Sequence, residues 1–234
     1  MKKNFLAIAI LHFLFLTGCT TSTNDISFLI NQGYTEKDAY IVTENGDPVF
    51  VDTSIAIDYY ISNSVSSLSD YCDAATNAIT NANKIDGVNI TFQFTNPSSN
   101  FSFISEHEVT APTISGVCNE LSCTTRSINL FYVGEDTLAS NQIFVDPNTN
   151  LIVFSTISFN LDTMSEIDTY KYTYIATHEI GHTLGLRDYD AQAETFAKGR
   201  SIMYGTYSSL YNFNDFTDED KYLLRWHYTN GNSE

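Results

Sequence analysis

Residues 178 to 188 read HEIGHTLGLRD, a stretch whose histidines and carboxylates have the types and the spacing of a metal site. His178 and His182 are four residues apart, so on a helix both imidazoles project from one face and can bind one cation at about 2.0–2.1 Å each. Glu179 follows the first histidine, which keeps its carboxylate out of the ligand pair but near the open side of the metal. The pattern therefore predicts two metal ligands with a general base beside them.

A third ligand is expected shortly after the second histidine. Gly185 lets the chain turn sharply, and Asp188, three residues later, can return to supply an oxygen. Two histidines and one carboxylate leave a fourth position for water, which is the arrangement of a catalytic zinc site. The alternative, two core histidines bonded to neighbours, is disfavoured because buried His and Glu side chains are costly without partners.

A long buried helix is needed to carry the two histidines. Thr163 and Glu166 fit a capping box, which predicts a helix from about Ser165 to Leu184 with Gly185 beyond its end. Apolar residues occur around the whole circumference of this segment. Such a helix is usually enclosed between a sheet and other helices.

Met203 lies downstream in the sequence SIMYG. Alone, such a methionine is more often core filler than a functional residue. Together with HExxHxxGxxD upstream, it resembles the Met-turn of the metzincin metalloproteases, the loop that forms a hydrophobic base under the metal. The resemblance implies a Zn²⁺ ion with these ligands: His178, His182 and Asp188.

The resemblance covers roughly residues 142 to 228. The letters FVDPNTNLIVFSTISFN look like the edge strand and the following strand of matrixin-like metzincins, and FTDEDKYLLRWHY resembles their C-terminal helix. The first half of the chain matches only in the order of its elements. The resemblance implies an α+β fold, an α/β sandwich with a twisted mixed sheet and an edge strand. An extended substrate would pair with that edge, around Leu151 to Ser155, by strand addition.

Two departures from the family pattern concern the site. Asp188 stands where most metzincins have His, as in snapalysin-like enzymes, which changes the subgroup and not the class. No cysteine-switch motif of matrixin type occurs. Astacins have Tyr two residues after the methionine, but Gly205 is found here. Tyr204 and Tyr207 are therefore expected to line the wall of the substrate pocket with Gly205, and not to act as metal ligands.

The remaining segments predict one domain with a sheet packed on helices. Two extended runs, YIVT and PVFVD, flank the turn signal NGDP, and residues 54 to 82 are expected to be mainly helical. Residues 95 to 126 predict loops with at most one short strand. Further strands are expected at 88–94, 127–133 and 151–160, the last divided near Ser155. A final helix should span Thr217 to His227, with Thr217 as its cap and Asp220 three residues later.

The beginning of the chain has the layout of a secretory signal, with Lys2 and Lys3 before an apolar run too short to span a membrane comfortably. The run ends in LTGC, which resembles a bacterial lipobox and implies that Cys19 is lipidated. The alternative is plain secretion with an incidental cysteine. We expect a signal peptide at 1–18, a polar tether at 19–38 and a catalytic domain at 39–234. The product would be lipid-anchored at the bacterial cell envelope or cell surface.

The net charge of −17 excludes several classes of partner. Removal of the signal would leave nine basic and 28 acidic residues, a net charge of −19. Such a surface argues against binding nucleic acid, and against membrane contact other than through the lipid anchor. We expect a monomer that meets a protein or peptide substrate. Structural Ca²⁺ held by the acidic loop at 146–150 is a secondary expectation, because hard cations need several oxygen ligands.

Three cysteines remain after the lipobox: Cys72, Cys118 and Cys123. One disulfide is plausible in an oxidising compartment, and Cys118 with Cys123 could close a small loop. A metal role is weak because no CxxC pair exists.

These features predict a zinc-dependent endopeptidase in which Glu179 takes a proton from the attacking water. Two alternatives stay open. One is a non-haem iron oxygenase, whose facial triad also has two histidines and one carboxylate. The other is a surface lipoprotein that binds a protein partner and has a non-catalytic metal site.

Overall fold

The computed structural model describes residues 39–95, 101–106, 129–133, 138–188, 201–203 and 213–230, with only the backbone for 101–106 and 129–133. The expected signal peptide and tether, residues 1–38 with Cys19, lie outside the described residues. So do Cys118, Cys123, Tyr204, Gly205 and Tyr207. Within the described part, none of the helices combines the length and the apolar character that crossing a membrane requires.

A six-stranded mixed sheet forms the centre of the fold, in the order β2-β1-β3-β6-β5-β4. Neighbouring strands from β2 to β6 are parallel, and β5 runs antiparallel to both β6 and β4. The strands are β1 (Ile57–Ile61), β2 (Phe92–Phe94), β3 (Phe101–Glu106), β4 (Asn129–Val133), β5 (Ala139–Asp146) and β6 (Leu151–Asn160). The α+β expectation is therefore confirmed.

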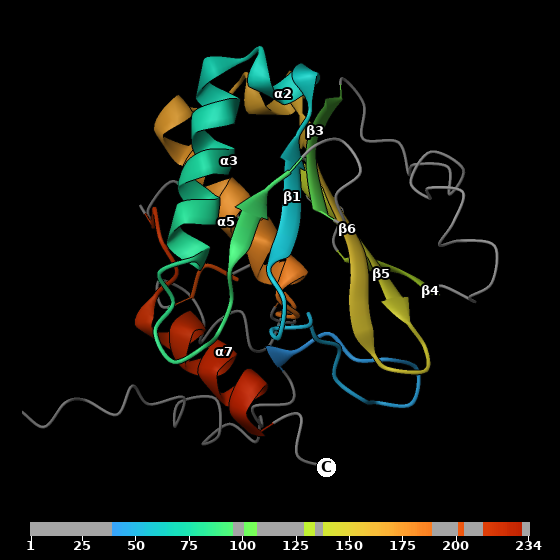
Figure 1. Cartoon of the computed structure of the whole chain (residues 1–234). Helices are drawn as coiled ribbons and strands as arrows, with labels where there is room; N and C mark the ends of the chain where they lie inside the picture. Colours follow the sequence, from blue (N-terminus) through green and yellow to red (C-terminus); the bar gives the residue numbers. More distant parts are fainter. Residues whose placement is uncertain are drawn as a thin grey trace, which may run out of the picture.

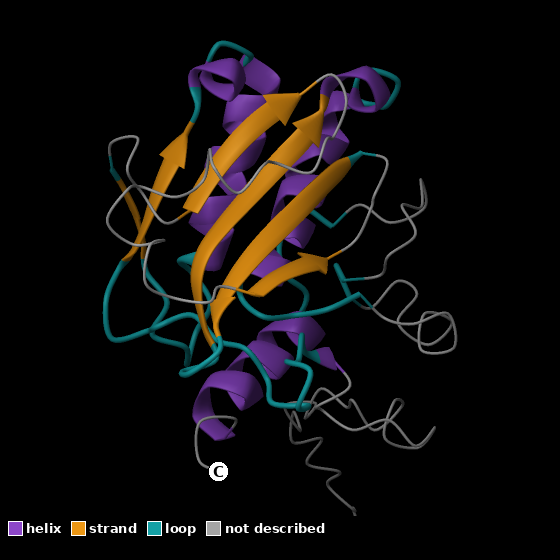
Figure 2. Ribbon diagram, turned by 90° about the vertical axis from the view of Figure 1, so that its right-hand side faces the viewer, coloured by secondary structure: helices purple, strands orange, loops and turns teal. Residues whose placement is uncertain are grey.

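The two central helices lie against one face of the sheet, and the last helix lies below the lower end of the strands (Figure 1, Figure 2). The helices are α2 (Asn63–Ser66), α3 (Ser69–Ala82), α4 (Leu161–Met164), the 3-10 turn η3 (Thr169–Lys171), α5 (Tyr172–Thr183) and α7 (Asp218–Asn230). The two long helices α3 and α5 are in contact. Small buried side chains on α3, such as Ala74, Ala75 and Ala78, allow the backbones to approach closely. Helix α5 is thereby enclosed between the sheet and α3.

The helix that carries the histidines begins later than predicted. Helix α5 starts at Tyr172 and not at Ser165, and Thr163 is not an N-cap. The cap of the preceding short helix α4 is Asn160, whose side chain accepts hydrogen bonds from the backbone N–H groups of Asp162 and Thr163. Asn is a stronger N-cap than Thr. The short helix α4 therefore begins directly after Asn160 and includes Thr163, the residue that the sequence pattern assigned as the cap.

Two strand predictions also need correction. Residues 57–61, expected within a helix, form β1, since the run IDYYI is rich in β-branched and aromatic residues and pairs on both sides. Strand β6 is continuous through Ser155. From Ser155 onward β6 is an interior strand, with β5 on one side and β3 on the other. Over residues 151–154 it pairs with β5, and on its other side the described residues provide only the bridge between Phe50 and Leu151, so substrate pairing with this stretch stays a prediction. In the described part of the chain, the sheet ends at β4.

The two extended runs near the start of the described chain form what we call the N-terminal hairpin, residues 39–51. Its arms meet at the Val42–Pro48 bridge, and Gly46 has a φ of 85° in the turn between them. The predicted turn is therefore confirmed, because only glycine adopts this backbone conformation readily. The hairpin also pairs with the chain after α5, through a bridge between Tyr40 and Leu186.

The predicted last helix is confirmed, with Thr217 as its cap. Thr217 Oγ1 accepts from the Asp220 N–H at 3.2 Å, and Asp220 Oδ2 accepts in return from the Thr217 N–H at 2.8 Å. This reciprocal pair satisfies two backbone donors at the helix start.

The loop at 146–150 is a tight hairpin turn between β5 and β6. Asp146 Oδ1 accepts from the N–H of Asn148 at 2.9 Å and from its side-chain amide at 3.1 Å. Asn150 has a φ of 56°, a conformation that Asn tolerates better than most residues. The acidic side chain thus has a role in the turn itself, and calcium binding here stays a prediction.

Candidate metal centre

The three side chains expected to bind a metal lie together in the structure. His178 Nε2 is 3.2 Å from Asp188 Oδ1, and His182 Nε2 is 3.7 Å from the same oxygen. The three candidate ligand atoms all lie within 4.8 Å of one another, and no other such group of His, Cys, Asp or Glu occurs among the described residues. The helical spacing of the two histidines and the turn after them therefore bring the three candidate ligands together, as the sequence predicts.

Both imidazoles are oriented by backbone carbonyl groups. The Nδ1 atom of His178 lies 2.8 Å from the carbonyl oxygen of Ile202, and that of His182 lies 2.9 Å from the carbonyl oxygen of Leu186. A carbonyl oxygen can only accept, so each Nδ1 carries the hydrogen in the metal-binding tautomer. Each Nε2 lone pair is then available on the side where Asp188 lies. This fits a metal, since ligating histidines usually donate their other N–H to such a group.

The electrostatics of the three groups are tightly coupled. Burial alone would lower the pKa of His178, but the adjacent Asp188 carboxylate, together with Glu179 and the carbonyl of Ile202, outweighs burial and raises that pKa well above its usual value. Burial lowers the pKa of His182 to about 4. Burial opposes ionisation of Asp188, yet the two imidazoles hold its pKa well below the ordinary range. Without a metal, these shifts favour a protonated His178 imidazole paired with an ionised Asp188 carboxylate.

Glu179 is 2% exposed and lies on the turn of α5 between the two histidines. Its backbone carbonyl accepts a hydrogen bond from the side-chain amide of Asn141 on β5, at 2.5 Å. The same amide donates to Thr183 Oγ1 at 2.8 Å, and Asn141 Oδ1 accepts from Ser155 Oγ at 2.7 Å. This buried network fixes α5 on the sheet. The sequence gives no signal for it, because Asn141 and Ser155 read as ordinary strand residues.

Met203 packs directly against α5 at the glycine between the two histidines. A Cβ atom added to Gly181 would lie 2.3 Å from Met203 Sδ, so any larger residue here would require the methionine side chain or the helix to move. The methionine is 1% exposed. It therefore forms an apolar support under the histidine pair, at the position where the sequence predicts a Met-turn.

Asp220 of α7 holds the chain around Met203 in place. Its Oδ1 accepts from Ser201 Oγ at 2.5 Å, and its Oδ2 accepts from the Ile202 N–H at 3.0 Å. Ser201 Oγ in turn accepts from the Met203 N–H at 3.0 Å. Burial raises the pKa of Asp220, and the hydrogen bonds from Ser201, Ile202 and Thr217 act against that rise. The sequence indicates Asp220 only as part of a helix cap, and its second role depends on tertiary structure.

The turn that brings Asp188 back to the histidines is made at Gly185, which has a φ of 90°. The Leu186 N–H donates to the carbonyl of Gly181 at 3.0 Å, and the Gly185 N–H donates to that of His182 at 2.9 Å. These two bonds are those of a Schellman-type helix end, for which glycine is the preferred residue. The predicted left-handed glycine is therefore confirmed.

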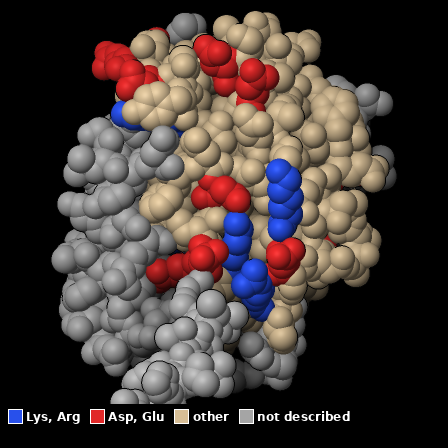
Figure 3. All heavy atoms as spheres, turned by 90° about the vertical axis from the view of Figure 1, so that its left-hand side faces the viewer, with Lys and Arg blue, Asp and Glu red and all other residues tan. Residues whose placement is uncertain are grey.

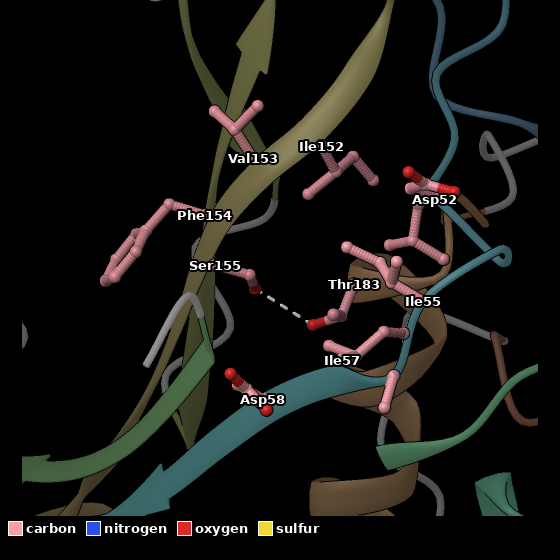
Figure 4. A pocket seen from close by; sticks show the side chains of 11 residues that line it. Asp52, Ile55, Ile57, Asp58, Ile152, Val153, Phe154, Ser155 and Thr183 are labelled. Atoms are coloured by element: carbon pink, nitrogen blue, oxygen red, sulfur yellow. Dashed lines mark hydrogen bonds between the residues drawn. The ribbon is translucent and has the colours of Figure 1, made fainter. Parts of the chain in front are cut away.

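A cavity of about 110 Å³ lies on the sheet side of α5, between β1 and β6. Its walls are mainly apolar, with Asp52 and Asp58 at the sides, and the hydrogen bond between Ser155 and Thr183 lies in it (Figure 4). None of the three candidate ligands lines it. This cavity is therefore separate from the candidate metal centre.

The helical side of the surface carries a small group of Lys and Arg side chains near the centre of the view and a separate one at the upper left, each with Asp and Glu side chains beside it (Figure 3). Lys221 Nζ lies 2.9 Å from Asp215 Oδ2, and Arg225 Nε donates to the carbonyl of Asp86 at 2.6 Å. The cationic groups on α7 are thus engaged with neighbouring acceptors.

Cys72, on α3, is not part of a disulfide. The expected pairing of Cys118 with Cys123 lies outside the described residues and stays a prediction.

Comparison with known proteins adds no family to these observations, since no protein-family model matches the chain and no curated protein matches it significantly.

Proposed function

We propose that the chain is a zinc-dependent endopeptidase of the metzincin type, close to its matrixin-like and snapalysin-like members. The observation that carries the proposal is the convergence of His178 Nε2, His182 Nε2 and an Asp188 oxygen within 4.8 Å of one another. The fixed tautomer of both imidazoles and the neighbouring Glu179 support it. Three protein ligands leave a coordination position open, as in catalytic zinc sites.

In peptide hydrolysis, His178, His182 and Asp188 would bind the metal, and Glu179 would transfer protons. A zinc ion at this centre would act as a Lewis acid on the scissile carbonyl and lower the pKa of water at the open position. Glu179 accepts the proton of the attacking water and then delivers it to the nitrogen of the departing amine. The Met203 side chain and the Asn141 network keep α5 fixed, so the Glu179 carboxylate does not have to change its position during the reaction.

The same proposal includes export. Residues 1–18 would act as a signal peptide, and a lipid on Cys19 would anchor the enzyme at the bacterial cell envelope. The acyl chains bury many methylene groups, which is how a lipidated N-terminus anchors without a membrane-spanning helix.

The decisive test compares Glu179→Gln with a matched substitution at an exposed glutamate, Glu166→Gln. Both proteins should bind one zinc ion, and cleavage of casein by Glu179→Gln should fall by about 10³-fold, since a positioned general base typically contributes about 10²–10⁴-fold. A zinc chelator should abolish the activity of the parent and of Glu166→Gln alike. Zinc binding without cleavage of casein or of a peptide library by the parent would point to a non-catalytic site. Metal analysis that finds iron would support the oxygenase alternative.

A further inference from the structure

A fully buried histidine, His227, joins α7 to the N-terminal hairpin. Its ring is stacked between Tyr40 and Phe50, with centroids 4.2 Å and 4.3 Å away and planes within 13° and 16° of parallel. Its Nε2 lies 2.8 Å from the carbonyl oxygen of Val49, so Nε2 carries the hydrogen and donates it. Burial lowers the pKa of His227 to about 4, and the neutral ring is the form that fits this place.

The hydrogen-bonded pair of His227 and Val49 lies directly against the turn that follows α5. A Cβ atom added to Gly185 would be 2.9 Å from His227 Nε2 and 2.7 Å from the Val49 oxygen. The space beside this glycine is therefore already filled by the pair. Tyr228, next along α7, donates its hydroxyl hydrogen to the carbonyl of Leu184 at 3.1 Å, so α7 contacts the end of α5 at two consecutive residues.

The N-terminal hairpin pairs with the same turn from another side. The Ile41 N–H donates to the carbonyl of Gly185 at 2.8 Å, and the Arg187 N–H donates to the carbonyl of Ala39 at 3.0 Å. The turn and the residues after it are thus held as a short extended segment on the edge of the hairpin. His227 is one of the side chains that join the hairpin to α7, with Tyr40 and Tyr228, and it is the one that lies beside Gly185.

Two of the three candidate ligands depend on that extended segment. Leu186 provides the carbonyl that orients the imidazole of His182, and Asp188 follows two residues later with the oxygen that faces both histidines. A displacement of the segment by a few tenths of an ångström would therefore change the orientation of one ligand and the position of another. Metal sites require their ligands within roughly 0.5 Å of the productive geometry.

We propose that His227 is a positioning residue for the metal centre, acting through Val49 and Gly185 on the segment that carries Leu186 and Asp188. The inference rests on the proposed function in one respect, namely that His178, His182 and Asp188 bind a metal. It does not depend on peptide cleavage. His227 binds no metal itself, since its Nε2 is engaged with Val49 and its ring is enclosed by Tyr40 and Phe50.

Three variants of the full chain separate positioning from general stability. His227→Leu removes the donor at similar volume, and His227→Gln keeps an N–H at the end of a side chain that can reach Val49. Tyr40→Phe is the control, because it keeps the aromatic ring and removes the hydroxyl that donates to the Leu223 carbonyl at 2.7 Å, a bond that joins the same hairpin to the same helix. Zinc affinity is measured by competition with a chelator, and the Co²⁺-substituted protein gives an absorption spectrum that reports ligand geometry.

We expect zinc affinity to fall by about 10-fold in His227→Leu, near the lower limit for residues that support metal ligands indirectly, with a changed Co²⁺ spectrum. His227→Gln should recover most of the affinity. Tyr40→Phe should lower the melting temperature yet bind zinc within twofold of the parent. A folded His227→Leu protein with parental zinc affinity and spectrum would overturn the proposal, as would an equal loss of affinity in Tyr40→Phe.

Hydrogen exchange on the unaltered protein keeps the proposal testable if His227→Leu does not fold. Coupling between two sites is reciprocal, so zinc must stabilise the hairpin as much as the hairpin stabilises zinc binding. The N–H groups of Ile41 and Arg187 should gain more protection from exchange on zinc binding than those of α3. An equal gain in both places would refute the coupling. Normal zinc binding without peptidase activity would contradict the proposed function and leave this inference intact.

Discussion

The contact between Gly181 and Met203 allows the support beneath the histidines to be tested quantitatively. An alanine at a helical glycine normally stabilises a helix by about 1 kcal/mol. At Gly181 the added Cβ would lie 2.3 Å from Met203 Sδ, so one of the two atoms must move by more than an ångström. Both residues are enclosed, and overpacking of a filled core costs about 1–3 kcal/mol. Gly181→Ala should therefore lie between neutral and about 2 kcal/mol destabilising.

The same substitution should have the opposite sign when the methionine is shortened. In a Met203→Ala background the sulfur is absent, and Gly181→Ala should then stabilise by the usual helical gain of about 1 kcal/mol. The coupling energy between the two positions is expected to be about 1–3 kcal/mol, within the range found for residues in contact. Met203→Ala alone should cost about 2–5 kcal/mol, as other deletions of large core side chains do.

Urea denaturation of the four proteins, all at one fixed free zinc concentration, measures this cycle, because zinc itself contributes to the apparent stability. The four slopes should agree, which shows that the free energies can be compared. If Gly181→Ala stabilises the parent and the Met203→Ala protein equally, the sulfur does not lie against the helix and the support described here is refuted.

Two further predictions concern the ligands and the support of the Met203 segment. Because Asp188 raises the pKa of His178 above its usual value, metal-free His178 is protonated at neutral pH, and zinc binding at pH 7.5 should release about one proton. Asp188→Asn removes the charge that raises the pKa of His178. Calorimetry in buffers of different ionisation enthalpy should then show less than half a proton released and a weaker zinc affinity. Unchanged proton release would contradict the pairing of His178 with Asp188. Asp220→Ala leaves the donors of Ser201 and Ile202 without their buried acceptor and should cost about 2–4 kcal/mol in urea denaturation. The exposed Asp218→Ala serves as control and should cost under about 1 kcal/mol, and similar losses in the two variants would refute the role of Asp220.

Local chemistry explains which structural predictions were confirmed. The turn at Gly46, the helix end at Gly185 and the cap at Thr217 each depend on a few adjacent residues, and the structure has all three. The helix start at Ser165 was wrong because Asn160, five residues earlier, competes for the backbone donors. The strand β1 was missed because its two parallel partners lie 35 and more residues away in the sequence.

The sequence alone determined the donor set and its spacing, because residues four apart on a helix share a face and a glycine allows the chain to fold back three residues before Asp188. It also indicated that the helix is buried. Only the tertiary structure decided which groups orient these side chains: the carbonyls of Ile202 and Leu186, the amide of Asn141, and the contacts of Asp220 and His227. The physical reason is that backbone carbonyls are the same at every position in the sequence. Their role as partners follows from where the chain brings them, as with Val49 and His227, which are 178 residues apart in the sequence.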